Sequence, residues 1–343
     1  MTAAPSTAAA SGANAAFRDR PPPSLSVVIP TYRRTDTIGR VLDALAASRG
    51  LPPGEAEVVV CDDASGDDTP RLLAAAAARL PLAMAWLSLG RNGGPARARN
   101  AALDRARGRA ILLLGDDIVA PPDLLARHAA WHGAHHADTD ALLGRTTWAP
   151  ELNAGALMRW LEDGGRRFAF DFRGLPSGRP VSGRSFYTSN VSFKRALLDR
   201  AGPFDESFPF ASHEDLELGD RFEREGMRLF YDPDAVAYHW HPLDWPALRR
   251  RIYRMGYSSV LYWRKIPRRG ALPRRLARAG LTRLAATAPA RAGARSLARR
   301  GEEGDAGCPR PFLWSAALTA LYWCGAADAA RGRPAAEDGM PGR

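Results

Sequence analysis

Two pairs of adjacent carboxylates follow apolar runs in the first third of the chain. Asp62 and Asp63 come directly after the apolar residues 58–61, and Asp116 and Asp117 follow residues 111–114 and one glycine. Apolar runs of this length, with turn residues behind them, are typical of buried parallel strands. Both pairs are therefore expected at the carboxyl edge of one sheet, where open α/β sheets bind ligands. Because an ionised carboxylate buried without a partner is costly, we expect a cation or the donor groups of a nucleotide to satisfy these acids.

The second pair has the pattern of a metal site. Consecutive carboxylates at a strand end point in different directions, so one of Asp116 and Asp117 can hold a metal while the other accepts from a hydroxyl. Mg²⁺ and Mn²⁺ prefer oxygen ligands, and Mg²⁺ is usually held by one or two carboxylates plus substrate phosphates. A diphosphate bridging to Asp117 would complete such a site. The alternative is an acidic turn that caps the helix expected after Pro121.

The first pair lies beside a turn with its own capping residues. Asp67 or Asp68 can cap the helix that follows. That leaves Asp62 and Asp63 free to accept hydrogen bonds from a base N–H or from ribose hydroxyls. A simple turn, with no ligand, is the alternative.

Two further groups of residues could take part in chemistry. Asp215 lies at a predicted helix start, where a fixed carboxylate makes a well-placed general base. Helix capping is its alternative role, since a carboxylate there is favourable by about 0.3 to 1 kcal/mol through the helix dipole, although Glu214 is available for that purpose. His239 and His241 are two residues apart and would share one face of a strand. One of them can be a metal ligand, or both can be structural.

The spacing of apolar residues predicts the elements that position these side chains. Strands alternating with helices imply parallel pairing and right-handed crossovers. No GxGxxG motif is present, so nucleotide binding would rest on the acids. The expected strands are residues 25–29, 57–61, 83–87, 110–114, 141–144, 188–193 and 228–231, and the expected helices are 35–47, 68–80, 95–106, 122–131 and 215–225.

Composition limits the class of protein. With 343 residues, 45% of them hydrophobic, the chain can hold one large domain or two modest ones. Residues 1–23 lack the pattern of a secretory signal and are expected to be a disordered tail. The longest apolar stretch, residues 312–327, is shorter than a membrane span of roughly 18 to 20 residues. Three cysteines without metal-ligand spacing indicate a reducing compartment, so we expect a cytoplasmic protein.

The net charge of +11 is concentrated in the last third of the chain, where residues 246–300 contain no Asp or Glu. Such a block favours an anionic partner, a lipid surface or a nucleic acid. Because Arg greatly outnumbers Lys throughout and Ala is abundant, genome composition is an alternative source of part of this charge. The same region is expected to form amphipathic helices broken by Pro267, Pro273 and Pro289.

Several motifs, in order, closely resemble those of the family 2 glycosyltransferases, and the resemblance covers roughly residues 25–241. The motifs are LSVVIPTYRR at residues 25–34, CDDAS at 61–65, NGGPARARN at 92–100, LGDD at 114–117, SNVSFKR at 189–195, GPFDE at 202–206 and EDLELGDRF at 214–222.

The resemblance implies an α/β fold of the GT-A type, a Rossmann-like fold with a mostly parallel sheet flanked by helices, followed by a helical extension. It implies a nucleotide-diphosphate sugar donor, with a UDP-sugar favoured, and a divalent cation, Mn²⁺ or Mg²⁺. Gly115 stands where many members carry an acid, so the metal would depend more on Asp117. The implied roles are donor binding for Pro30, Thr31, Tyr32, Asp62, Asp63, Asn92 and Asp116, metal binding for Asp117 and His239, and catalysis for Asp215, with Glu214 in reserve.

The implied reaction is transfer of the sugar to an acceptor hydroxyl with inversion, in the synthesis of cell-envelope polysaccharide, glycolipid or a related glycoconjugate. The acceptor would be a saccharide or a lipid-linked molecule, at the inner face of the cell membrane if the basic helices contact anionic lipid, with no nucleic acid partner. The expected divisions are residues 1–23 (tail), 24–243 (transferase), 244–330 (basic helical extension) and 331–343 (tail). A nucleotidyltransferase and a non-catalytic basic binding module are the alternatives.

Overall fold

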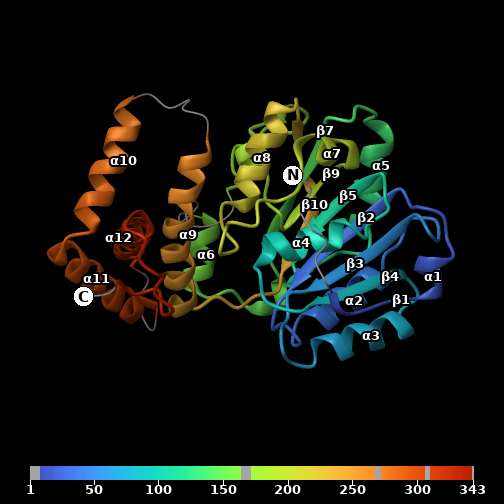
Figure 1. The fold of residues 1–343 in the computed structure, drawn as a ribbon, viewed down its shortest axis with the longest axis horizontal. Helices are drawn as coiled ribbons and strands as arrows, with labels where there is room; N and C mark the ends of the chain where they lie inside the picture. The colour runs from blue at the N-terminus through green and yellow to red at the C-terminus, as the bar shows by residue number, and fades with distance from the viewer. Residues whose placement is uncertain (1–7, 164–170, 267–271, 306–309, 342–343) are drawn as a thin grey trace. The chain divides into compact units, whose positions relative to one another are not determined.

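The computed structural model describes residues 8–163, 171–266, 272–305 and 310–341. Within these residues the chain forms two compact units, one built around a ten-stranded sheet and one built of helices (Figure 1). Unit 1 contains the described residues of Met1–Pro150, Phe172–Ser207 and Glu214–His241, and unit 2 those of Glu151–Asp171, Phe208–His213 and Pro242–Arg343.

The first half of unit 1 alternates strands and helices, as the apolar spacing predicts. Its strands pair in parallel in the order β4-β3-β2-β5. Thr31, Asp62 and Ser88 lie side by side at the carboxyl edge because the register pairs each with the next. The elements are β2 (Leu25–Thr31), α2 (Ile38–Ala46), β3 (Ala56–Asp62), α3 (Thr69–Arg79), β4 (Ala83–Leu89), α4 (Pro95–Leu103) and β5 (Ala110–Leu114).

The second half makes the sheet mixed instead of mostly parallel. β9 runs antiparallel between β5 and β7, because it enters from the carboxyl edge, where Asn190 pairs with Leu114 at the end of β5. β10 lies parallel to β7 and antiparallel to the short β6 and β8. The elements are β6 (Ile118–Val119), α5 (Leu124–Ala134), β7 (Asp140–Trp148), β8 (Pro180–Val181), η3 (Gly183–Ser185), β9 (Asn190–Lys194), α7 (Arg195–Ala201), α8 (Glu214–Arg224) and β10 (Arg228–His239).

Residues 8–18 are ordered as β1 (Ala8–Ala13) and α1 (Ala15–Arg18), whereas we expected residues 1–23 to be a disordered tail. β1 pairs antiparallel with β4. The Asn14 side chain donates to the carbonyls of Ala77 and Leu82, over 3.1 and 2.7 Å. The expectation was wrong for this segment because the open edge of β4 supplies hydrogen-bond partners that composition does not reveal.

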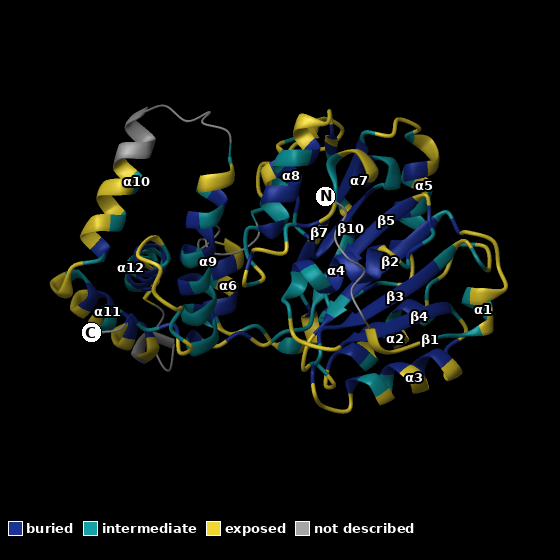
Figure 2. Cartoon of the chain, viewed as in Figure 1, coloured by how far each residue is buried: buried dark blue, intermediate teal, exposed yellow. Residues whose placement is uncertain are grey.

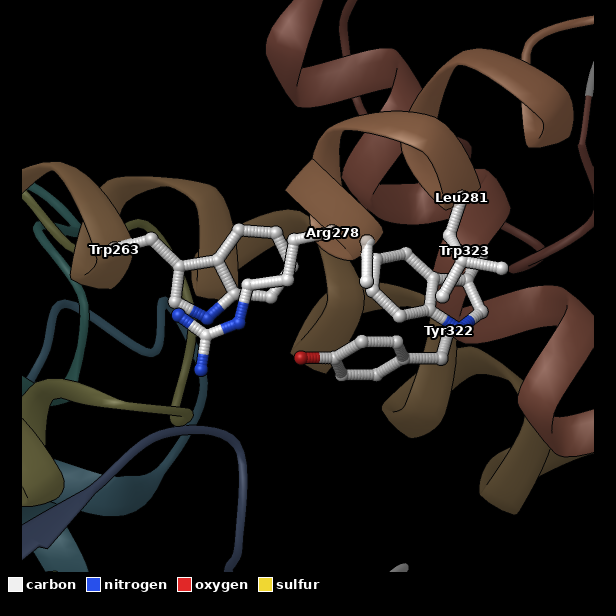
Figure 3. A pocket seen from close by; sticks show the side chains of 6 residues that line it. Trp263, Arg278, Leu281, Tyr322 and Trp323 are labelled. Atoms are coloured by element: carbon white, nitrogen blue, oxygen red, sulfur yellow. The ribbon is translucent and has the colours of Figure 1, made fainter. Parts of the chain in front are cut away.

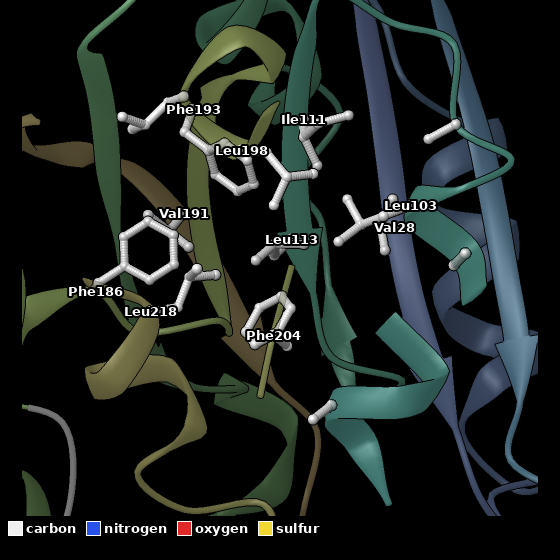
Figure 4. Close-up of a cluster of buried hydrophobic side chains, with 14 of the residues drawn as sticks. Val28, Leu103, Ile111, Leu113, Phe186, Val191, Phe193, Leu198, Phe204 and Leu218 are labelled. Carbon is white, nitrogen blue, oxygen red and sulfur yellow. The ribbon is translucent and has the colours of Figure 1, made fainter. Parts of the chain in front are cut away.

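Both faces of the sheet are buried (Figure 2). Successive strand residues point to opposite faces, so Val28, Ile111 and Leu113 join one apolar cluster, drawn in Figure 4, while Val27 and Leu112 join the other. The first cluster includes side chains of α4, α7 and α8, and the second includes those of α2, α3 and α5. Helices therefore cover both faces, and the strand ends are left as the place for a ligand.

Unit 2 consists of helices that begin at prolines or close to them. Pro246 and Pro311 lie in the first turns of α9 and α12, and Pro273 and Pro289 are the second residues of α10 and α11, so the predicted breaks are helix starts. Pro267 lies outside the described residues. None of the described helices is long and apolar enough to cross a membrane. The helices are α6 (Ala156–Asp163), α9 (Trp245–Lys265), α10 (Leu272–Ala285), α11 (Ala288–Asp305) and α12 (Pro311–Ala330), with the short η1 (Pro150–Leu152) before them.

A buried polar network holds three of these helices together. Asp328 on α12 accepts from Arg291 of α11 and, over 2.6 Å, from the hydroxyl of Tyr253 on α9. That hydroxyl in turn accepts from the backbone N–H of Ala336, over 3.4 Å. Residues 331–341, part of the expected tail 331–343, therefore have specific contacts with α9.

Candidate active site

The turn between β5 and β6 carries Asp116 and Asp117 at the carboxyl edge of the sheet. The backbone N–H of Tyr32, the residue directly after β2, donates to Asp116 Oδ2 over 3.4 Å. Burial and the neighbouring charge of Asp117 raise the pKa of Asp116 to about 7. The pair therefore lies next to the residues that follow β2, as expected for acids at the carboxyl edge of one sheet.

Asp117 faces the end of β10. β6 pairs with β10 so that Ile118 lies opposite His239, and His239 Nε2 is 3.2 Å from Asp117 Oδ2. The Arg34 guanidinium lies 3.8 Å from the same oxygen. Burial alone would raise the pKa of Asp117, but His239 and Arg34 outweigh it and hold this pKa well below its usual range. Asp117 is thus a carboxylate kept ionised by its partners.

These residues fit a divalent cation. In an octahedral site with ligands about 2.1 Å from the ion, neighbouring ligand atoms are about 3.0 Å apart, close to the 3.2 Å between His239 Nε2 and Asp117 Oδ2. The described residues contain no group of three or more His, Cys, Asp or Glu side chains that could hold a metal. Substrate oxygens and water would have to complete the coordination, as is usual for Mg²⁺.

The structure distinguishes His239, the last residue of β10, from His241, which follows it. The His239 ring stacks on Trp148, with centroids 5.1 Å apart and planes 11° apart. His241 stacks on His239 at 5.7 Å, and its Nδ1 lies 3.1 Å from Arg34 Nη1. His239 is therefore the imidazole directed at Asp117, and His241 is directed at Arg34.

Asp62 and Asp63 are not free, contrary to our expectation. Asp62 accepts from the Ser65 hydroxyl and, over 2.6 Å, from the Ser88 hydroxyl. Asp63 accepts from the amide of Asn92 over 2.9 Å and from the N–H groups of Gly93 and Gly94 over 2.8 and 2.7 Å. Both carboxylates are almost completely buried. A carboxylate oxygen can accept a further hydrogen bond, so their contact with a donor stays a prediction.

The backbone after β2 and β3 is strained. Arg33 and Ala64 have φ angles of 55° and 58°, in the left-handed region that side-chain-bearing residues rarely adopt. The two turns are tied together because the Arg33 N–H donates to the Ser65 hydroxyl over 2.8 Å. Such strain collects at functional sites. In the residues directly before Arg33, Pro30 is partly buried, Thr31 is buried and Tyr32 is 40% exposed.

Glu214 and Asp215 begin α8 in different surroundings. Glu214 is buried and accepts from Arg99 over 2.8 Å, and Arg99 also donates to the Thr188 hydroxyl over 2.9 Å. Asp215 is partly exposed and accepts a local hydrogen bond from the Leu216 N–H over 2.8 Å. Burial and the charge of Glu214 raise the pKa of Asp215 to about 7. This geometry favours Asp215 over Glu214 as a base.

Sequence reasoning gave no role to Arg34 or Arg99. Arg34 is the last residue of the motif at 25–34 and lies three residues after the end of β2, so its place after a strand end was a usable signal for a ligand contact. Arg99 and Glu214 are 115 residues apart in the chain, and no local pattern connects them.

The fold is that of the GT-A glycosyltransferases, as expected. The mannosyltransferase PcManGT from Pyrobaculum calidifontis, in complex with GDP-Man and Mn²⁺, superposes with a TM-score of 0.59 at 22% identity, covering 91% of this chain and 88% of its own. Residues 1–349 of Staphylococcus aureus TarS superpose with a TM-score of 0.50 at 20% identity, covering 90% and 92%.

The chain belongs to the family 2 glycosyltransferases. The sequence model of glycosyl transferase family 2 matches residues 26–166, and that of glycosyl transferase family group 2 matches residues 110–325, more than half of the chain. Validoxylamine A glucosyltransferase of Streptomyces hygroscopicus subsp. limoneus is 32% identical over 265 residues, which is 70% of this chain and 55% of that protein. The succinoglycan biosynthesis protein ExoO of Rhizobium meliloti is 42% identical over 106 residues, 31% and 28% of the two chains. The match thus spans about half of one relative and about a quarter of the other.

Proposed function

We propose that this protein is an inverting glycosyltransferase that moves a sugar from a nucleotide-diphosphate sugar to an acceptor hydroxyl. The observation that carries the proposal is the convergence of Asp117, His239 and Arg34 at the carboxyl edge of the sheet. A carboxylate, an imidazole and a guanidinium meet there in an arrangement suited to a cation and a diphosphate. The PcManGT structure contains GDP-Man and Mn²⁺, and TarS has been solved with UDP-GlcNAc, which supports a donor of this chemical class.

Asp117 and His239 would hold the divalent cation, Mn²⁺ or Mg²⁺. Such an ion neutralises the charge that develops on a departing diphosphate. Arg34, whose guanidinium lies 3.8 Å from Asp117 Oδ2, would contact the diphosphate. Asp116 would accept a hydrogen bond from a hydroxyl of the donor.

Asp215 would act as the general base. It takes the proton of the acceptor hydroxyl while that oxygen attacks the anomeric carbon and the bond to the diphosphate breaks, so the configuration at this carbon inverts. A raised pKa suits a base that works near neutral pH. Glu214 remains the reserve candidate, although its ion pair with Arg99 fits a positioning role better.

The donor nucleotide would lie on the turns after β2 and β3. The exposed ring of Tyr32 could stack on the base. Pro30, Thr31 and Asn92, which lie in or beside these turns, would also contact the donor. A UDP-sugar is the favoured donor. The acceptor would be a saccharide or a lipid-linked molecule of the cell envelope. The basic helices would bring the protein to anionic lipid at the inner face of the cell membrane, from the cytoplasmic side.

The two alternative functions account for fewer of these observations. A nucleotidyltransferase would normally need a glycine-rich phosphate loop after the first strand of the parallel series, and residues 30–34 contain no glycine. A non-catalytic basic binding module would not explain the paired acids at the carboxyl edge of the sheet.

Nucleotide release from UDP-, GDP- and dTDP-sugars, with Mn²⁺, Mg²⁺ or EDTA, tests the proposal. We expect one donor to be hydrolysed in the presence of metal and Asp117→Ala to weaken donor binding and the response to metal. Asp43→Ala is the matched control, because Asp43 belongs to an exposed ion pair with Arg79. If no donor is hydrolysed and none shifts the melting temperature, the transferase proposal is wrong.

A further inference from the structure

Unit 2 contains a pocket of about 330 Å³ between α9, α10 and α12 (Figure 3). Trp263 and Trp323 approach each other with ring centroids 5.8 Å apart, and Tyr322 meets Trp323 edge to face at 5.5 Å. Trp263 belongs to α9, whereas Tyr322 and Trp323 belong to α12, so the packing of the two helices brings the three rings together. The lining residues are Trp263, Ala277, Arg278, Leu281, Tyr322 and Trp323.

Among the described residues that line the pocket, Arg278 is the charged one, and its charge is positive. The Arg278 guanidinium lies 5.1 Å from the centroid of the Trp263 ring, a cation–π arrangement that holds the charge at the pocket. Residues 246–300 contain sixteen Arg and Lys residues and no Asp or Glu. The surroundings therefore favour an anionic ligand.

An exposed apolar strip continues from the pocket along α10. Leu281 lines the pocket and is 43% exposed, and Leu284, one turn further along the same helix, is 60% exposed. Residues three apart are neighbours on a helix surface. A neutral saccharide would need several polar groups to fix its orientation, whereas this pocket offers one guanidinium among indole, phenol and aliphatic surfaces. The chemistry suits a molecule with one anionic end and an apolar chain.

We infer that this pocket is a docking site for the phosphate headgroup of an anionic membrane lipid. Arg278 pairs with the phosphate, Trp263 and Trp323 lie at the level of the headgroups, and Leu281 and Leu284 reach the first carbons of the acyl chains. Indole rings favour such interfaces because one part is apolar and the other polar. In helices that lie at a membrane interface, the buried apolar surface and the attraction to anionic lipid both contribute to the membrane affinity. The inference rests on the membrane contact proposed above and assigns it a site; it does not depend on the donor site.

Co-sedimentation with vesicles tests the site through two matched arginine substitutions. The vesicles contain equimolar phosphatidylcholine and phosphatidylglycerol, with pure phosphatidylcholine for comparison, and the full chain is used. Arg278→Gln should weaken binding about five-fold, the change expected for one basic residue at an anionic surface. Arg283→Gln removes the same charge from an exposed position of α10 that does not line the pocket, so it should change binding less than two-fold. Equal losses in both variants, or no vesicle binding at all, would overturn the site.

Tryptophan fluorescence gives a second measurement that keeps the aromatic packing. Brominated phosphatidylglycerol should quench the wild type strongly, and the double variant Trp263→Phe, Trp323→Phe should lose most of that quenching. Unchanged quenching contradicts the inference. The inference is also contradicted if vesicles do not bind while soluble glycerol phosphate or an oligosaccharide raises the melting temperature of the wild type and not that of Arg278→Gln. Donor hydrolysis is measured on the same preparations, so a failure of the transferase proposal is visible separately.

Discussion

Neighbouring carboxylates in this protein have opposite properties. Burial raises the pKa of Asp116, while His239 and Arg34 hold that of Asp117 low. Arg99 pairs with Glu214, while the adjacent Asp215 has no basic partner within hydrogen-bond distance among the described contacts. Side chains that differ by one position thus acquire different roles from their partners.

Replacing Asp215 by Asn tests the proposed base. Asn has nearly the same shape but cannot accept the acceptor proton, so turnover should fall by about 10² to 10⁴-fold while donor affinity changes little. Steady-state kinetics with the donor identified by the panel provide both values. Asp199→Asn, at an exposed position of α7, should behave as wild type. Full turnover in the Asp215 variant would remove this residue from the role.

The pH profile follows from the raised pKa of Asp215, about 7. A base must be deprotonated, so kcat/KM should be maximal above this pKa and fall as the pH drops through about 7. Glu214→Gln removes the neighbouring negative charge, and the acid limb should therefore move to lower pH. If the acid limb of the pH profile does not move in Glu214→Gln, a group other than Asp215 controls it.

At the scale of elements, α9 and α12 pack closely through two glycines. A Cβ atom at Gly256 would overlap the carbonyl oxygen of Tyr322, and one at Gly325 would overlap that of Tyr253. The contact is reciprocal, since each glycine faces the other helix beside an aromatic residue. Close approach of two helix backbones requires small residues at the crossing, and any side chain there would push the helices apart.

Gly256→Ala should therefore destabilise the helical unit, by about 1 to 3 kcal/mol or more. Gly280→Ala is the control: it is also a helical glycine, but no atom lies within 4 Å of its added Cβ. It should be neutral or stabilise by up to about 1 kcal/mol, because Ala favours helix. Chemical denaturation followed by circular dichroism gives both free energies. Equal effects of the two substitutions would contradict the packing argument.

At the scale of the whole molecule, buried histidines connect stability to pH. His128 and His132 on α5 both bond to the Ser192 hydroxyl of β9, each over 2.8 Å. Burial lowers the pKa of His128 to about 4 and also lowers that of His132. Both rings are therefore neutral in the folded protein at pH 7, whereas they take up protons in the unfolded chain near pH 6.5.

The contribution of His128 and His132 to the free energy of unfolding should consequently fall as the pH drops from about 7 towards 4, because these two rings then bind more protons in the unfolded state than in the folded state. His128→Gln should reduce this drop by an amount on the order of 3 kcal/mol. His136→Gln makes the same substitution at an exposed position after α5 and is the control variant. Urea denaturation between pH 4 and pH 8 measures the difference, and parallel curves for wild type and His128→Gln would refute it.

The division of the chain into domains also belongs to this scale. The transferase region 24–243 and the helical extension 244–330 stay predictions. The described residues of Glu151–Asp171 and Phe208–His213 belong to the same compact unit as the carboxy-terminal helices, so segments distant in sequence join one unit, which a single boundary along the chain cannot represent.

The amino-acid sequence alone determined the α/β class, the first four strands of the parallel series and the acids at their ends. Those features depend on local patterns: apolar runs, helical spacing and turn residues. The length of β10 was underestimated, because a strand was expected over residues 228–231 and the observed strand is Arg228–His239. The register of β10 shifts between Asp232 and Val236, and the Asn190 side chain donates to Ala235 O across that bulge over 2.8 Å. A strand held by a distant side chain does not follow a simple period.

Only the tertiary structure decided which of the candidate side chains meet. It brings His239 to Asp117, which are 122 positions apart in the chain (239 − 117 = 122), it pairs Arg99 with Glu214, and it places the Asn92 loop on Asp63. It likewise assembled the aromatic pocket from three helices. The physical reason is that a carboxylate's function depends on the charges and donors within a few ångströms, and long-range folding supplies most of those.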